Sequence, residues 1–188
     1  KEKAPVAITT LGGRYAVNDD RTIPDTMQTL FEFPSGLIVS YTMLEATSGR
    51  LERYGLLEFR GTNGTLYVGG ANDYKVIPTQ RGQFQTWDKL MEAEDFAVAP
   101  AGKGKLADGS YAEPTANLVR NFLDCIKSRK TPMCTLEDGH LSTNMAHLAT
   151  IALQTNQRLD WNAEEEVITN SKEANKLLHY EYRKPWRL

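Results

Sequence analysis

The sequence predicts an α+β fold: a largely antiparallel, open β-sheet with helices packed on one face and the other face available for oligomerisation. Three observations favour this class. Strand-like segments occupy the first eighty residues, short turn sequences join them, and helix-like segments dominate after residue 114. A chain of 188 residues is long enough for one domain with its own apolar core. We therefore treat residues 1–188 as one domain.

The strands are predicted from runs of β-branched and aromatic residues bounded by turn residues: 6–16, 26–33, 37–44, 54–60, 65–68 and 74–77. Pro34-Ser35-Gly36 joins the second and third runs, and both runs alternate apolar and polar residues, which predicts a hairpin. Asn63-Gly64 predicts a second hairpin. Residues 79–113 are rich in glycine and lack periodic apolar positions, which predicts a long loop.

Pro114 suits the first turn of a helix whose apolar face contains Leu118, Phe122, Cys125 and Ile126. The Thr135–Asp138 segment resembles a capping box that opens a second helix. Its predicted core face is Leu141, Met145, Leu148, Ala152 and Thr155. Residues 158–161 predict a short strand, and Ser171 caps a last helix over 172–180, with Ala174, Leu177 and Leu178 inward. Tyr41 and Trp161 are interpreted as core residues.

Composition excludes several classes of function. A net charge of −2 creates no basic field for nucleic acid, and no apolar run approaches the roughly 20 residues of a membrane helix. Cys125 and Cys134 form no disulfide framework or metal motif. Residues 102–107 match the letters of a GxGxxA dinucleotide fingerprint, but Pro100 and Gly109 oppose the strand and helix that such a site requires. We expect neither cofactor nor metal site in these residues.

One polar segment, residues 12–26, joins two predicted strands and concentrates the groups that a sugar or polyol site requires. Carboxylates accept hydroxyl protons there, and arginine and asparagine donate to hydroxyl oxygens. A second interpretation is also open, in which the segment is a solvated polar loop whose side chains pair with one another. Composition alone does not separate the two.

Several motifs, in this order along the chain, resemble one family: Gly12-Gly13-Arg14-Tyr15, Asp19-Asp20-Arg21, Pro24-Asp25-Thr26, Phe31–Gly36, Glu58–Leu66, Asn121–Arg129, Glu137–Ser142, Glu173-Ala174-Asn175 and Tyr182–Trp186. The family is the glucose–fructose oxidoreductase/inositol dehydrogenase (Gfo/Idh/MocA) family, and the resemblance is to its C-terminal domain. Such enzymes pair an NAD(P)-binding Rossmann domain with this α+β domain, and usually transfer a hydride to or from a sugar or polyol. The mixed sheet face, with Ile38, Leu44 and Leu56 among Ser40, Thr42 and Glu58, is interpreted as an oligomer interface.

The resemblance implies that these residues lack the cofactor site and the catalytic lysine and histidine, so the chain alone is expected to be inactive. Glu2-Lys3 does not match the family's lysine motif because Ala4 follows where the family has proline. NAD(P) is expected in the full-length enzyme. The implied partners are the sugar or polyol, a Rossmann domain and further copies in a dimer or tetramer. The predicted substrate contacts are Arg14, Tyr15, Asn18, Asp20, Arg21, Asp25 and His140.

Two alternatives stay open: a free-standing carbohydrate-binding or assembly module, and part of an NAD-dependent glycosidase of the same family. The sequence begins at Lys1 rather than at methionine, so we expect it to be a piece of a longer or processed protein. The cytoplasm is the expected compartment, and the periplasm is the alternative because the native N-terminus is not seen.

Overall fold

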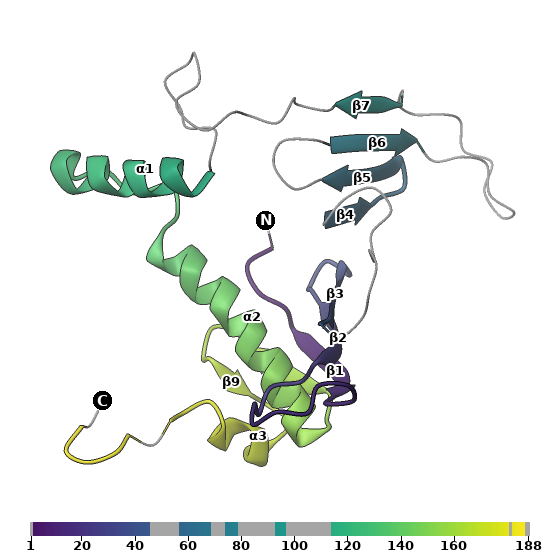
Figure 1. Ribbon diagram of the computed structural model, residues 1–188, viewed down its shortest axis with the longest axis vertical. Coiled ribbons are helices and arrows are strands. Elements are labelled where there is room, and N and C mark those ends of the chain that lie inside the picture. The colour runs from purple at the N-terminus through teal and green to yellow at the C-terminus, as the bar shows by residue number, and fades with distance from the viewer. Residues whose placement is uncertain are drawn as a thin grey trace, which may run out of the picture. The chain divides into compact units, whose positions relative to one another are not determined.

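The computed structural model describes residues 2–45, 57–68, 74–78, 93–96, 114–180 and 182–186. The chain forms two compact units, one of Lys1–Ser48 with Cys134–Leu188 and the other of Gly49–Met133 (Figure 1). Both units combine antiparallel sheet with helix, which confirms the predicted α+β class. The strands form two sheets, however, where the sequence predicted one.

The first unit contains a five-stranded antiparallel sheet in the order β3-β2-β1-β8-β9. Its strands are β1 (Ala7–Gly13), β2 (Thr26–Glu32), β3 (Ile38–Leu44), β8 (Leu159–Asn162) and β9 (Val167–Ile168). The predicted hairpin is confirmed, because β2 pairs with β3 in a register that sets Phe31 opposite Val39. Gly36 provides the turn with a positive φ of 85°, a conformation that glycine adopts without steric cost.

Two helices belong to this unit: α2 (Leu136–Thr155) and α3 (Lys172–Lys176). Helix α2 opens with the predicted capping box, in which Thr135 Oγ1 accepts from the Asp138 amide at 3.1 Å and Asp138 Oδ2 accepts from the Thr135 amide at 3.0 Å. The helix ends where Asn156 adopts a left-handed conformation. Ser171 caps α3 as predicted, but that helix ends at Lys176 rather than at residue 180.

The core of this unit lies between α2 and one face of the sheet. Its buried members include residues from β1, β2, β8 and both helices: Ile8, Phe31, Leu148, Ala152, Leu159, Trp161 and Ala174. Leu148, Ala152 and Trp161 are therefore confirmed as core residues. Tyr41 and Leu177 were wrongly assigned to the core, since they are 50% and 45% exposed. Leu177 is exposed because it follows the last turn of α3, and Tyr41 lies on the edge strand β3.

The second unit contains a four-stranded antiparallel sheet in the order β4-β5-β6-β7. Its strands are β4 (Leu57–Arg60), β5 (Gly64–Val68), β6 (Tyr74–Pro78) and β7 (Glu94–Phe96). The predicted hairpin around Asn63-Gly64 is confirmed by the β4–β5 pairing. Strand β7 corrects the prediction of an uninterrupted loop over 79–113, because it pairs with β6. Residues 79–92 and 97–113 of the predicted loop lie outside the described residues.

The two sheets also change the interpretation of the mixed face. Ile38 and Leu44 lie on β3 in the first sheet, whereas Glu58 lies on β4 in the second. Leu56 lies outside the described residues. These side chains therefore do not form one continuous face of a single sheet.

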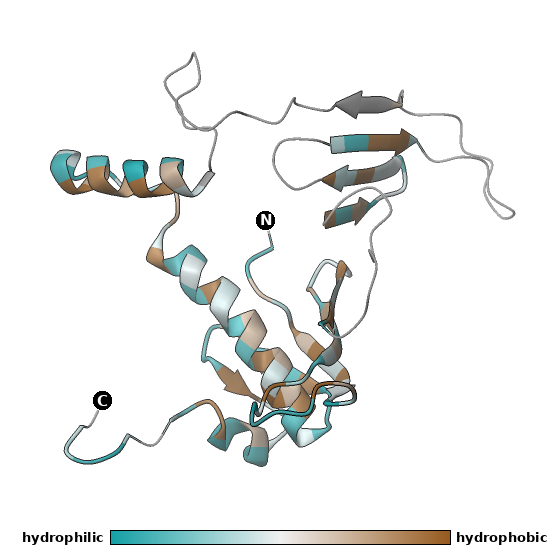
Figure 2. Ribbon diagram, in the orientation of Figure 1, coloured by the Kyte–Doolittle hydropathy of each residue, from teal (hydrophilic) through white to brown (hydrophobic). Residues whose placement is uncertain are grey.

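Helix α1 (Pro114–Ser128) belongs to the second unit and has the predicted amphipathic pattern, with apolar residues along one side (Figure 2). On this face Leu118, Phe122 and Ile126 are 43%, 56% and 48% exposed. Arg120 Nη2 and Asp124 Oδ1 form an ion pair at 2.8 Å on the polar side.

Among the described residues, no helix is both long enough and apolar enough to span a membrane.

Candidate functional site

The predicted polar segment is the loop of residues 14–25, which connects β1 to β2. Two glycines at the end of β1 make its start possible. A Cβ added to Gly12 would lie 2.3 Å from the Thr26 carbonyl oxygen and 2.8 Å from the Met27 Cα, so only glycine fits there. A Cβ on Gly13 would lie 2.7 Å from Cζ of the Tyr15 ring, which means that this ring packs against the Gly13 backbone.

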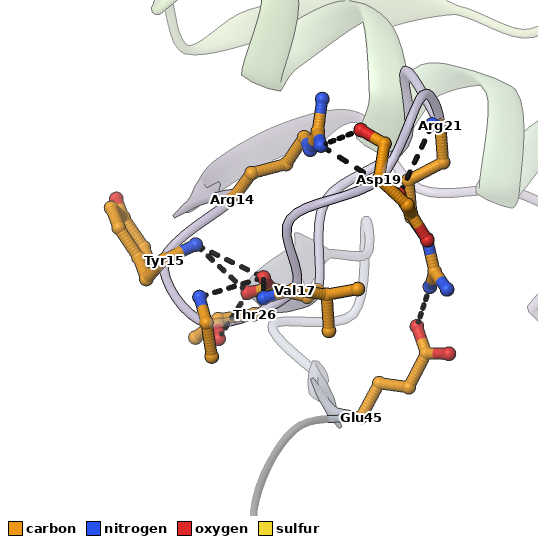
Figure 3. A network of polar contacts seen from close by, with 9 residues as sticks. Arg14, Tyr15, Val17, Asp19, Arg21, Thr26 and Glu45 are labelled. Carbon is orange, nitrogen blue, oxygen red and sulfur yellow. Dashed lines mark hydrogen bonds and ion pairs between the residues drawn. The ribbon is translucent and has the colours of Figure 1, made fainter.

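The carboxylate of Asp25 organises the backbone of this loop. Among its partners, Tyr15, Val17 and Thr26 are labelled in Figure 3. Its two oxygens accept hydrogen bonds from the backbone amides of Tyr15, Ala16 and Val17 at 2.8–3.1 Å. The Thr26 hydroxyl donates to the same carboxylate at 2.9 Å. Asp25 itself is fully buried, so its carboxylate accepts these hydrogen bonds away from solvent.

These hydrogen bonds explain the electrostatics of Asp25. The amides of Val17 and Ala16 contribute most, and together with the Tyr15 amide and the Thr26 hydroxyl they hold the pKa of the carboxyl well below its ordinary value. Burial acts in the opposite direction and is outweighed. The carboxylate is therefore charged at neutral pH and fully used within the loop. This geometry gives Asp25 an organising role, whereas the sequence analysis proposed it as a substrate contact.

A chain of ion pairs fixes the other side of the loop: Arg14, Asp19, Arg21 and Glu45. Asp19 Oδ2 lies 2.7 Å from Arg21 Nε, and Arg21 Nη1 lies 2.7 Å from Glu45 Oε2. Arg14 Nη2 lies 3.6 Å from Asp19 Oδ1 and donates to the Asp19 carbonyl. Burial raises the pKa of Asp19, but the hydrogen bonds and charge of Arg21 outweigh it and keep that pKa below its ordinary value. Both arginines are therefore already paired.

Three predicted contacts remain available to a ligand: Tyr15, Asn18 and Asp20. All three are exposed, and Tyr15 is 74% exposed. Within the part of the chain that the structure describes, the side chains of Asn18 and Asp20 have no hydrogen-bond or ion-pair partner. The interpretation of the segment as a self-paired polar loop therefore holds for Arg14, Asp19, Arg21 and Asp25. The interpretation as a sugar or polyol site stays a prediction.

His140 does not lie with this loop. Strand β8 begins four residues after α2 ends, pairs through Leu159 with Ile8, and runs back toward the start of α2. Strand β1 is antiparallel to β8, so it runs the other way and carries the loop beyond the C-terminal end of α2 (Figure 1). His140 lies in the second turn of α2, and the helix from His140 to Thr155 alone spans about 22 Å. The prediction that His140 faces the same region as the loop is wrong.

His140 instead belongs to a separate polar cluster that the sequence analysis did not anticipate. Its Nε2 lies 2.5 Å from Glu166 Oε1 and 3.0 Å from Asn144 Nδ2. A small pocket beside this cluster is lined by Leu141, Asn144, Trp161 and Glu166, among others. Asn144 could have been found from the sequence, since it lies one helical turn after His140. Glu166 follows a turn between two short strands and carried no such signal.

Glu45 is a second missed residue with a recoverable signal. It directly follows β3, and β3 pairs with β2 so that Leu44 lies opposite Thr26. The amide of Glu45 consequently donates to the Asp25 carbonyl at 3.0 Å, and its side chain reaches Arg21. An acidic residue at the end of β3 was therefore positioned to meet an arginine in the loop before β2.

No group of three or more His, Cys, Asp or Glu side chains is placed to hold a metal ion among the described residues. The GxGxxA letters at residues 102–107 lie outside those residues. The paired glycines of β1 also differ from a dinucleotide site, because a loop rather than a helix follows them. The nearby amides of Tyr15, Ala16 and Val17, which could otherwise face a phosphate, are occupied by the Asp25 carboxylate.

One protein family is similar to the C-terminal part of the chain. Residues 97–188 match a family model described as "Oxidoreductase family, C-terminal alpha/beta domain" (GFO_IDH_MocA_C2). This part of the chain is similar to the C-terminal domain of Gfo/Idh/MocA oxidoreductases. The resemblance seen in the sequence motifs is thereby confirmed, including the assignment to the C-terminal domain of the family.

Solved oxidoreductases share the fold. An aldose-aldose oxidoreductase from Caulobacter crescentus, complexed with glycerol, matches with a TM-score of 0.56 at 12% identity over 84% of this chain and 42% of that one. An oxidoreductase from Agrobacterium radiobacter, in complex with NAD+, L-tartaric acid and magnesium, matches with a TM-score of 0.57 at 14% identity over 84% of this chain and 43% of that one. The chain thus spans about two fifths of the length of these relatives. A search of curated protein sequences finds no match.

Proposed function

We propose that this chain is the substrate-side domain of an NAD(P)-dependent oxidoreductase acting on a sugar or polyol, and that the loop of residues 14–21 contacts the substrate. One observation carries the proposal. The loop backbone is fixed by the buried Asp25 carboxylate, while the side chains of Tyr15, Asn18 and Asp20 are exposed. A rigid backbone with unpaired polar side chains is preorganised for a ligand, because little further ordering is needed on binding.

The chemistry of these side chains suits a polyhydroxylated ligand. The Asp20 carboxylate accepts hydroxyl protons, and the Asn18 amide both donates and accepts. A carboxylate is an acceptor that favours short, strong hydrogen bonds to hydroxyl groups. Arg14 and Arg21 each have five N–H donors, so donors remain after their ion pairs with Asp19 and Glu45. His140 is not part of this proposed site, since it lies at the other end of α2.

The NAD(P) itself, which would accept or donate the hydride, is proposed to bind a separate Rossmann domain of the full-length enzyme. The described glycine pair of β1 does not fit that role, because the amides beside it already bind the Asp25 carboxylate. We therefore expect neither turnover nor NAD(P) binding from this chain alone. The two relatives described above support the general reaction class, since one is an aldose-aldose oxidoreductase and the other was solved with NAD+.

Association between copies is a further part of the proposal. The face of the first sheet opposite α2 carries Leu11, Leu30 and Ile38, which are 70%, 46% and 55% exposed. Exposed apolar residues that cluster on a sheet face are typical of protein interfaces. We propose a dimer or tetramer that covers them, which sedimentation of the chain at micromolar concentration tests directly.

Substitution of Asp20 tests the proposed substrate contact. We expect Asp20→Ala to weaken the binding of a sugar or polyol about tenfold, because a charged hydrogen-bond acceptor is lost. Calorimetric titration of the 188-residue chain with D-glucose, myo-inositol and D-glucitol measures the effect. Glu165→Ala is the matched control, since Glu165 is an exposed carboxylate in the turn between β8 and β9. Equal affinities for Asp20→Ala and the unchanged chain would remove Asp20 from the site.

A further inference from the structure

We propose that Tyr15 is a stacking platform that makes this site prefer the closed ring of a pyranose over an open-chain polyol. The inference rests on the proposed function of the loop and adds the form of the sugar that the loop binds. It also assigns a role to Gly13, which is to leave room for the Tyr15 ring.

The first observation is the position of the ring. A Cβ on Gly13 would lie 2.7 Å from Cζ, 2.8 Å from Oη and 3.1 Å from Cε1 of Tyr15. The phenol end of the side chain therefore rests on bare backbone. The side chain is nevertheless 74% exposed, so most of the ring surface is open to solvent.

The second observation is that the backbone of Tyr15 is held in place. Its amide donates to both oxygens of the buried Asp25 carboxylate, at 3.1 and 3.0 Å. The ring points away from this network of polar contacts (Figure 3). Since neither the backbone nor the phenol end needs to be ordered by a ligand, the exposed ring is available for stacking at a small entropic cost.

The third observation is the polar composition of the same loop. Asn18 and Asp20 follow in the same loop and have exposed side chains without partners among the described residues. A pyranose ring has a face of C–H groups and an edge of hydroxyl groups. The C–H face suits the negatively polarised face of an aromatic ring, while the hydroxyl edge suits a carboxylate and an amide. An open-chain polyol offers the hydroxyl groups but no flat C–H face.

Two probes and three variants test this inference on the 188-residue chain. The probes are methyl β-D-glucopyranoside, whose ring cannot open, and D-glucitol, which has no ring. We expect the unchanged chain and Tyr15→Phe to bind the glucoside about five- to tenfold more tightly than D-glucitol. Tyr15→Ser is expected to lose this preference by weakening only the glucoside. Gly13→Ala is expected to do the same, because the new methyl group displaces the ring without removing it.

The outcomes separate this inference from the proposed function. If Tyr15→Ser weakens both probes equally or neither of them, the stacking role is overturned, while binding by the unchanged chain still supports the proposed function. If the unchanged chain binds neither probe, both proposals fail. Circular dichroism of each variant confirms that the fold is retained, and Tyr15→Phe separates stacking from a hydrogen bond of the phenol. Loss of the ring preference in Tyr15→Phe would likewise overturn stacking.

Discussion

Asp25→Ala is expected to lower the melting temperature of the chain by roughly 5 °C or more, because this substitution leaves buried donors without an acceptor. The amides of Tyr15, Ala16 and Val17 and the hydroxyl of Thr26 all donate to the Asp25 carboxylate. Asp20→Ala is the control, since Asp20 is exposed in the same loop, and it should leave the melting temperature unchanged. Thermal unfolding followed by circular dichroism measures both. Equal melting temperatures for the two variants would contradict the organising role of Asp25.

The same carboxylate predicts a dependence of stability on pH. The pKa of Asp25 in the folded chain lies well below its ordinary value, so the folded state binds a proton less readily than the unfolded state. Its contribution to stability is therefore present above the ordinary pKa of about 3.9 and is lost as the pH falls toward the lowered pKa. Asp25→Asn cannot titrate. We expect its deficit relative to the unchanged chain to be full at pH 6 and smaller at pH 3, as measured by urea unfolding. A deficit that is the same at both pH values would contradict this account.

Gly12→Ala is expected to destabilise the chain by about 3 kcal/mol or more, because the added methyl group meets backbone atoms that cannot move alone. The Thr26 carbonyl oxygen would lie 2.3 Å from the new Cβ. The neighbouring Gly13→Ala is the matched control. Its new Cβ meets the far end of the Tyr15 side chain, which can rotate away, so its cost should be below about 1 kcal/mol. Similar unfolding free energies for the two variants in urea would show that β1 and β2 do not approach as described.

Features that depend on local sequence were predicted well. The β2–β3 hairpin follows from alternation on both sides of Pro34-Ser35-Gly36, and its turn needs only the freedom of Gly36. The capping box of α2 follows from side chains within one turn, Thr135 and Asp138. In each case the residues that determine the structure are neighbours in the sequence, so a single sequence contains the whole interaction.

Features that depend on distant residues were predicted less well. The apolar face of α1 was correctly identified, but amphipathic spacing does not reveal whether another element covers it, and Phe122 is 56% exposed. Tyr41 alternates like a core residue, yet it lies on the edge strand β3, where burial depends on the reach of the covering elements. His140 was grouped with the loop because it lies near the start of a helix. The local sequences of β1 and α2 do not reveal the direction of one relative to the other, and that direction separates His140 from the loop.

The candidate site combines features that the sequence predicts with features that it does not. Composition directed the prediction to this loop, since carboxylates, guanidinium groups and an amide are concentrated there. Composition could not show which of them are free to bind a ligand. Asp25 and Asp20 have the same side chain, but Asp25 is buried beneath three amides while Asp20 is exposed. That difference arises from the close approach of β1 and β2 at Gly12, which only the folded chain contains.

The central claim is that this chain binds the sugar or polyol and leaves the cofactor to another domain. Amide ¹H–¹⁵N spectra of the labelled 188-residue chain, recorded during separate titrations with D-glucose and with NAD+, test it most directly. We predict saturable shifts from D-glucose confined to the amides of residues 14–21 and their neighbours on β1 and β2, and no saturable shifts from NAD+. Saturable shifts from NAD+, or shifts from D-glucose that spare this loop, would contradict the account.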